Sequence, residues 1–182
     1  EGHVDEDFHY QIDLGPTLTE LIGGQVRERW DGRSFLPVIQ NGESAGRPYL
    51  VVSQMAWSCQ RGVRFDNWML IRTYHDGLKD FPELMLFDID KDPHETTNLV
   101  DEKPEVVAKG MRLLDEWVTE QMVTSDSPTD PMWNVIQEGG PFHTRGNFHH
   151  YAEKLRSEGR KDAAERLEAR HRKFQKIYNL EK

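Results

Sequence analysis

The apolar positions of this chain change their spacing near residue 48, from a helical pattern to an alternating one. Within residues 13–24 the apolar side chains recur at the spacing of one helix face. These side chains are Leu14, Leu18, Leu21 and Ile22. Asp13 suits the cap of such a helix, Pro16 its first turn and Gly23-Gly24 its end. We therefore predict a short helix with a continuous apolar face.

From residue 48 onward the chain becomes rich in β-branched and aromatic residues. Strands are predicted in PYLVVSQ, in the two halves of QRGVRFDNWMLIRTYHDG, and in ELMLFDI. Asp66-Asn67 are good turn residues between the second and third strands. Short connections join neighbouring strands in antiparallel fashion, and a sheet of this size needs cover on one face.

A long helix that begins at Pro104 can supply this cover. It carries a wide apolar stripe made of Val107, Met111, Leu113, Leu114, Trp117 and Val118. Residues 124–135 then show the Ser, Asp and Pro content of a linker. Helical patterns return at 148–157 and 161–178. On the last helix, charges four residues apart predict ion pairs, namely Asp162/Arg166 and Glu168/Arg172.

These patterns predict an α+β fold. Its centre is a small four-stranded antiparallel sheet covered by a long helix, with a helical N-terminal segment and a helical C-terminal tail. We divide the chain into residues 1–47, 48–125 and 126–182.

Composition and charge narrow the classes of partner. The chain has 182 residues, enough for one domain with an appendage, and no apolar run approaches the ~18 residues of a membrane span. The formal net charge of -9 argues against nucleic acid as a partner. Residues 153–182 nevertheless hold ten Lys and Arg against six Asp and Glu. We expect this basic tail either to dock on the acidic body or to be solvated, and binding of an anion or a partner is the alternative.

The acidic stretch LMLFDIDKDPHETTNLVDEKPEVV places Asp88, Asp90 and Asp92 at alternate positions, as an EF-hand calcium loop does. Such a loop needs glycine at position six and glutamate at position twelve, where this chain has Pro93 and Leu99. We therefore predict a turn in which the carboxylates accept backbone N–H groups, and no metal.

Other candidate chemistry is weak. His143, His149 and His150 have no accompanying acid ligand, and neighbouring histidines on a helix point apart, so surface or interface histidines are predicted. The segment EGGPFHTRG lacks the Gly-Lys-[Ser/Thr] of a phosphate loop. Cys59, the single cysteine, excludes an internal disulfide and is expected in a strand or core.

Four segments, taken in order, resemble the C-terminal portion of formylglycine-dependent sulfatases. The segment LFDIDKDPHETTNLVDEKPEVV is similar to their strand, Asp-Pro-x-Glu turn and Pro-Glu-Val helix start. IDLGPTLTELIGG with WDGRSFLPVI resembles the passage that closes the catalytic domain, and GVRFDNWMLIRTYHDG the strand pair of the small subdomain. DPMWNVIQEGGPFHTRG is similar to the extended tail of some bacterial members.

The resemblance implies an alkaline-phosphatase-like fold and hydrolysis of sulfate esters. In this family a cysteine in Cys-x-[Pro/Ala]-x-Arg becomes formylglycine, and a calcium ion orients the sulfate. Here Cys59 stands in CQRGV, which does not fit that motif. We therefore carry over no catalytic and no metal-binding residue, and expect the chain to be an inactive C-terminal portion that depends on a preceding catalytic domain.

The resemblance also implies that loops of the small sheet help to line the substrate cleft. We expect Trp57 to stack on a sugar or aromatic ring, and Arg61 or His75 to contact an anionic substituent. The alternative for Trp57 is core packing, that for Arg61 is a surface ion pair, and that for His75 is a position in a solvated loop. Homo-oligomer contacts are expected in the tail, through Trp133, Phe142, Phe148 and Tyr151.

Two further readings stay open. The chain could be a non-catalytic assembly or binding module of sulfatase ancestry, or the same portion of a phosphonate monoester hydrolase. A single reduced cysteine favours a cytoplasmic over a periplasmic location. The apolar face of residues 14–22 would be exposed in the isolated chain, which predicts self-association or disorder of this helix.

Overall fold

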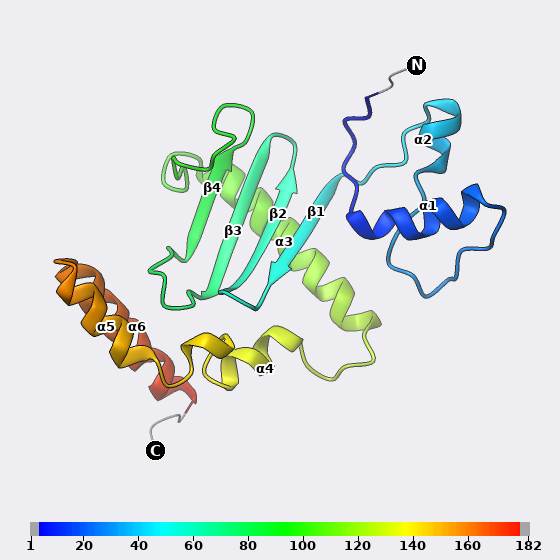
Figure 1. Ribbon diagram of the computed structural model, residues 1–182. Helices are drawn as coiled ribbons and strands as arrows, with labels where there is room; N and C mark the ends of the chain where they lie inside the picture. Colours follow the sequence, from blue (N-terminus) through cyan, green and yellow to red (C-terminus); the bar gives the residue numbers. More distant parts are fainter. Residues whose placement is uncertain (1–3, 179–182) are drawn as a thin grey trace. The chain divides into compact units, whose positions relative to one another are not determined.

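The computed structural model describes residues 4–178, and the side chains of residues 4–172. The chain divides into two compact units, one of residues 1–50 with 64–66 and one of residues 51–63 with 67–182 (Figure 1). Among the described residues, no helix combines the length and the apolar character needed to cross a bilayer.

The first unit is helical. It contains η1 (Gln11–Asp13), α1 (Leu14–Leu21) and α2 (Leu36–Asn41). The predicted helix is confirmed as α1, although it ends at Leu21. The short apolar piece before Asn41-Gly42 is also helical, and Gly42 ends it in the left-handed conformation, with φ +68°.

Asp13 does not cap α1 with its side chain, contrary to the prediction. Its carboxylate is fully buried and accepts hydrogen bonds from the backbone N–H groups of Tyr10 (2.7 Å) and Arg33 (2.8 Å) and from the guanidinium of Arg47 (2.8 Å). Burial raises the pKa of Asp13, but these hydrogen bonds outweigh it and lower the pKa below its usual value. The buried carboxylate thus ties three segments of this unit together.

The sheet has the predicted four strands in the order β1-β2-β3-β4: β1 (Tyr49–Gln54), β2 (Cys59–Phe65), β3 (Trp68–His75) and β4 (Leu84–Asp88). Strands β3 and β4 are antiparallel, and Leu70 lies opposite Leu86. Both leucines are fully buried. Asp66, at the predicted turn, has φ +45°, a conformation that aspartate tolerates better than most residues.

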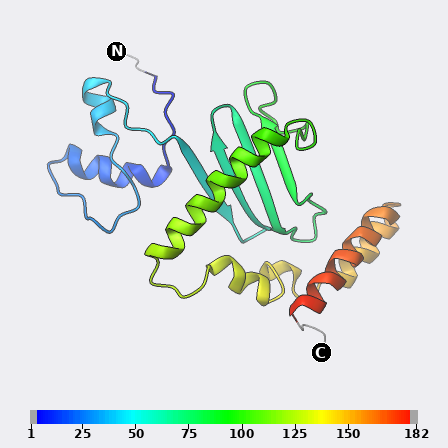
Figure 2. The same cartoon turned by 180° about the vertical axis from the view of Figure 1, so that it is seen from behind.

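Helix α3 (Pro104–Thr124) crosses one face of the sheet, as predicted (Figure 2). All six members of the predicted stripe are buried or half-buried, and Leu114 is only 2% exposed. Gly110 on the same helix is also buried, because a helix packs closely where a side chain is missing. The α+β architecture is therefore confirmed.

The acidic stretch between β4 and α3 forms turns. Asp88 accepts a hydrogen bond from the backbone N–H of Lys91 (3.3 Å), and Asp92 from those of Thr96 and Thr97 (2.8 Å each). The side chain of Asn98 extends the edge strand by accepting the N–H of Leu86 (2.9 Å). These carboxylates serve as turn residues, as the sequence indicated.

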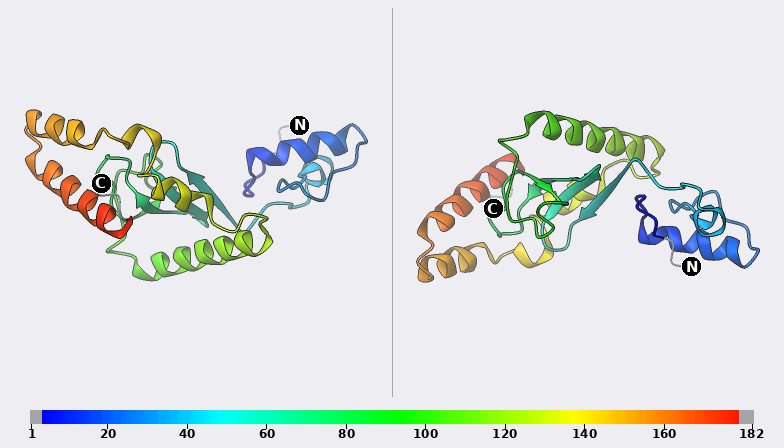
Figure 3. Two further views of the ribbon diagram at one scale, coloured as in Figure 1. Left: turned by 90° about the horizontal axis from the view of Figure 1, so that it is seen from below. Right: turned by 90° about the horizontal axis from the view of Figure 1, so that it is seen from above.

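The tail consists of α4 (Pro131–Gln137), η2 (Phe142–Thr144), α5 (Phe148–Ser157) and α6 (Lys161–Tyr178). The prediction of a linker at 124–135 is wrong from Pro131 onward, because Asp130 caps α4 by accepting the N–H of Met132 (3.0 Å). Helices α5 and α6 lie side by side as a hairpin (Figure 3). Ala152 and Leu167 are buried between them and Leu78.

Two charged side chains of α6, Arg166 and Glu168, form ion pairs with residues outside that helix. Arg166 pairs with Asp80 (2.6 Å), and Glu168 pairs with Arg156 of α5 (2.6 Å). Arg172 approaches only the backbone oxygen of Glu168 (3.4 Å). The predicted pairs at four-residue spacing therefore give way to tertiary partners that the sequence pattern did not reveal.

We expect Leu114→Ala to lower the free energy of unfolding by about 2–5 kcal/mol, because it leaves a cavity between α3 and the sheet. Val123→Ala is the control on the same helix, because Val123 is 79% exposed, and it should change stability by less than about 0.5 kcal/mol. Urea unfolding followed by circular dichroism measures both. Equal losses in the two variants would contradict the packing described.

Candidate functional site

The predicted site residues lie on the sheet and its connections. In a meander of four strands, the β1–β2 and β3–β4 connections lie at the same end of the sheet, and α4 runs beside that end (Figure 1). Trp57 lies in the first connection and His75 at the start of the second, whereas Arg61 is inside β2. The structure thus brings Trp57 and His75 to one end.

Trp57 presents its indole to solvent and is 63% exposed. The ammonium of Lys79 lies 5.4 Å from the centre of the indole ring, within the range of a cation–π interaction. The imidazole of His143, from η2 of the tail, lies 5.5 Å from it at a tilt of 50°. The exposed ring is therefore flanked by one residue of the β3–β4 connection and one of the tail.

Gly77 holds the two connections against each other. Its φ is +64°, and a Cβ at this position would lie 1.7 Å from the carbonyl oxygen of Trp57, so only glycine fits. Its N–H donates to Nδ1 of His75 (3.1 Å), and its carbonyl accepts from Nε2 of His143 (3.1 Å). Two histidines, one from the sheet and one from the tail, therefore fix the backbone beside Trp57.

His75 is buried, with 7% of its surface exposed. Its ring lies against the backbone of Gly140, where a Cβ would come within 2.4 Å of Nε2. Burial lowers the pKa of His75 below its ordinary value, the charges of His171 and His143 lower it further, and Asp76 acts in the opposite direction. His75 is thus a neutral packing residue between the sheet and the tail.

Arg61 is also buried, and its guanidinium forms an ion pair with Asp130 of the tail. Its two Nη atoms donate to the two carboxylate oxygens of Asp130 at 2.6 and 2.7 Å, while its Nε donates to Ser53 (3.3 Å). The guanidinium also lies 5.7 Å from the ring of Trp117 on α3. Hydrogen bonds from Arg61 lower the pKa of Asp130 despite its burial. An anionic ligand could reach this guanidinium only by displacing Asp130.

The β3–β4 connection is clasped by the α5–α6 hairpin. Arg170 donates to Asp76 (2.9 Å) and to the carbonyl of Phe81 (2.7 Å), and Arg166 binds Asp80. The expected docking of the basic tail on acidic residues is seen here. Sequence reasoning did not identify Lys79 or His143 as neighbours of Trp57, and no local pattern marks them, because they come from separate elements.

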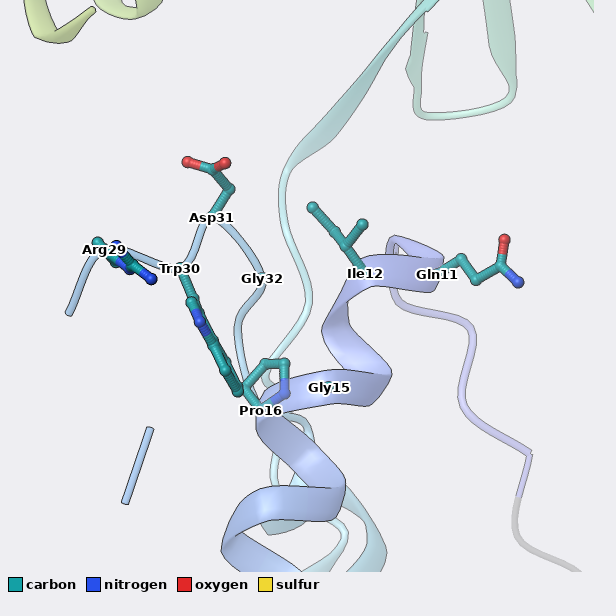
Figure 4. Close-up of a pocket in the computed structure, with 8 residues that line it drawn as sticks. All are labelled: Gln11, Ile12, Gly15, Pro16, Arg29, Trp30, Asp31 and Gly32. Atoms are coloured by element: carbon teal, nitrogen blue, oxygen red, sulfur yellow. The ribbon is translucent and has the colours of Figure 1, made fainter. Parts of the chain in front are cut away.

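Other hollows and clusters are less defined. In the first unit, a pocket of about 480 Å³ lies beside the Trp30 indole and Pro16 (Figure 4). Among the described residues, Asp5, Asp7 and His9 place ligand atoms within 4.8 Å of one another. All three already have partners, because His9 binds Asp5 (2.6 Å) and Asp7 accepts a hydrogen bond from the hydroxyl of Ser44 (2.5 Å).

Residues 1–121 match the family described as N-sulphoglucosamine sulphohydrolase, C-terminal, and the chain belongs to this family. The resemblance inferred from the sequence is thereby confirmed for the segments within residues 1–121. The segment at 130–146, like all residues from 122 onward, lies outside the match.

Relatives and solved structures agree. The chain is 31% identical to arylsulfatase K of Gallus gallus, covering 63% of this chain and 23% of the relative. It is also 31% identical to the multifunctional alkaline phosphatase superfamily protein PehA of Trinickia caryophylli, covering 54% and 21%. A candidate sulfatase of Bacteroides thetaiotaomicron VPI-5482 superposes with a TM-score of 0.50 at 25% identity, covering 65% and 27%. The chain spans about a fifth of the curated relatives' length.

We expect Asp130→Ala to cost about 3–5 kcal/mol of stability, because it leaves the buried Arg61 guanidinium without a partner. Asp126→Ala in the same exposed loop is the control and should have little effect. The double variant Arg61→Met with Asp130→Ala should be more stable than Asp130→Ala alone, as measured by its free energy of unfolding in urea. No recovery in the double variant would contradict the assignment of the loss to a stranded charge.

Acidification should weaken the fold through His75. Because its pKa in the folded protein is below the ordinary value of 6.5, the unfolded chain binds a proton more readily, and stability falls as the pH drops below that value. His75→Asn keeps an acceptor for the Gly77 N–H without titrating, so it should flatten the dependence between pH 7.5 and 5.5. The exposed His150→Asn is the matched control. Parallel curves for wild type and His75→Asn would refute this role.

Proposed function

We propose that this chain acts as the C-terminal part of a sulfuric ester hydrolase, in which it shapes the substrate cleft without carrying a catalytic residue. Membership of the N-sulphoglucosamine sulphohydrolase C-terminal family carries this proposal. The exposed Trp57 at the loop end of the sheet supports the cleft role, because binding sites gather on loops held by a rigid scaffold. The proposed substrate is a sulfate ester.

The residues of this chain do not fit the family's catalytic groups. Cys59 is fully buried, burial raises the pKa of its thiol to about 11, and its sequence context lacks the formylglycine motif. The cluster of Asp5, Asp7 and His9 includes a nitrogen ligand, whereas calcium prefers oxygen. We therefore place formylglycine and calcium in a preceding catalytic domain and expect this chain to be inactive alone.

Two apolar surfaces support an association with such a domain. Helix α1 exposes the predicted stripe: Leu14 is 46%, Leu18 56%, Leu21 56% and Ile22 84% exposed. In the second unit, the sheet face opposite α3 holds a shallow apolar pocket lined by Val52, Met69 and Ile71, among others. Exposed apolar surface of this extent is typical of an interface, and the catalytic domain is its proposed occupant.

The three predicted cleft residues have different proposed parts. Trp57 offers the ring for stacking on a sugar or aromatic group of the substrate. Arg61 and His75 are buried, so their proposed effect on an anionic substituent is exerted through the loops that they support. Trp133 and Phe142 are 43% and 85% exposed and are the proposed oligomer contacts of the tail.

In the full-length protein, Trp57→Ala should raise KM for a sulfate ester about two- to twelve-fold, the equivalent of about 0.5–1.5 kcal/mol of lost stacking. The value of kcat should change little, because the catalytic groups lie elsewhere. Steady-state kinetics with a panel of aryl and sugar sulfates measures both constants. Trp30→Ala is the matched control, because Trp30 is also a partly exposed tryptophan, at 39%, and belongs to the first unit.

The same panel separates the remaining candidates. Hydrolysis of phosphonate monoesters in preference to sulfates would favour the alternative that the sequence left open, a phosphonate monoester hydrolase. Absence of hydrolysis of every ester by the full-length protein would reject the hydrolase proposal. The chain would then be an assembly module whose exposed Trp133 and Phe142 contact a partner.

A further inference from the structure

We infer that Trp57, Lys79 and His143 form a binding site for a flat ring that carries an anionic substituent, and that the tail completes this site. The inference rests on the proposed function. It assigns the contact with the anionic group of the substrate to Lys79, a residue that the sequence analysis did not select. It replaces Arg61 and His75 as the direct anion contacts by Lys79, with His143 as the residue that positions the loop.

The ring and the cation are both available. Trp57 is 63% exposed, and in the described part of the chain its indole N–H has no hydrogen-bond partner. The ammonium of Lys79 lies 5.4 Å from that ring and has no carboxylate partner among the described residues. A ligand ring can therefore stack on the open part of the indole while its anionic group pairs with the adjacent ammonium.

Arg61 and His75, the two buried residues expected from the sequence to contact an anion, do not offer such contacts. Arg61 uses both Nη atoms on Asp130 at 2.6 and 2.7 Å, and His75 is 7% exposed with its Nδ1 engaged by Gly77. Recruiting either of them would break contacts that hold the tail to the sheet. Lys79 is exposed and can move toward a ligand without such a loss.

His143 makes the site dependent on the tail. It binds the carbonyl of Gly77 (3.1 Å) and packs its ring 5.5 Å from the Trp57 indole, so it fixes the connection that carries Lys79. A bond to a carbonyl requires the proton of His143 to be on Nε2. His143 lies outside the residues 1–121 that match the family. The tail therefore adds a site feature to the part of the chain that defines the family.

Direct binding tests this with the full-length protein. The probes are benzenesulfonate, a ring with an anion but no ester bond; benzyl alcohol, a neutral ring; and methyl glucuronide, a carboxylated sugar. Isothermal titration gives each Kd, and tryptophan fluorescence gives an independent signal. Benzenesulfonate should bind more tightly than methyl glucuronide, because the site is inferred to take a flat ring; tighter binding of the sugar would overturn that part of the inference.

Lys79→Gln should weaken binding of the anionic probe by up to about five-fold, the size expected for one exposed charged contact, and leave binding of the neutral ring unchanged. Lys79→Arg should keep the affinity. Trp57→Ala should weaken binding of every probe about two- to twelve-fold, and His143→Ala should weaken all of them by loosening the loop. Trp30→Ala, at a tryptophan that is 39% exposed in the first unit, and Lys161→Gln, an exposed lysine at the first position of α6, are the matched controls.

Unchanged Kd values in Lys79→Gln and Trp57→Ala, with the melting temperature also unchanged, would overturn the inference. If the same protein still hydrolyses sulfate esters, the proposed function survives that result. Weaker probe binding in these two variants, with the controls intact, supports the site. If binding follows the predicted order but no sulfate ester is hydrolysed, the site stands and the proposed function fails.

Discussion

The second unit depends on one buried ion pair, between Arg61 of β2 and Asp130 at the start of α4. Its side chains are 10% and 8% exposed, so both charges have lost most of their hydration and must satisfy each other. The bidentate geometry does this, and Asp130 in addition caps α4. A carboxylate that begins a helix is thus also the anchor of the tail.

From this anchor the tail reaches the loop end of the sheet. Met132 and Ile136 of α4 pack on Cys59, which explains the full burial of the single cysteine. Beyond α4, Gly140 lies against His75 and His143 binds Gly77. Along the chain, the tail therefore contacts strand β2 through Asp130 and α4. Its later residues contact the β1–β2 and β3–β4 connections, where the exposed Trp57 lies.

The family relationship covers the sheet and its covering helix, whereas the contacts just described come from residues beyond 121. The matched residues are therefore followed by a tail that packs on the end of the sheet. Such support would matter for the proposed cleft wall, because a ligand that binds preformed groups does not have to order them. This is the physical reason to assign the tail a part in recognition as well as in stability.

The sequence by itself determined the local elements: the stripe of α1, the strands, the turn at Asp66-Asn67 and the apolar face of α3 follow from periodicity and turn chemistry. It also contained the segments that identify the family. Only the tertiary structure decided the partners of the charged residues, because Arg61, Asp13 and Arg166 bind groups 69, 34 and 86 positions away. Periodicity reports which face of an element is buried, but it carries no information about which distant side chain meets it.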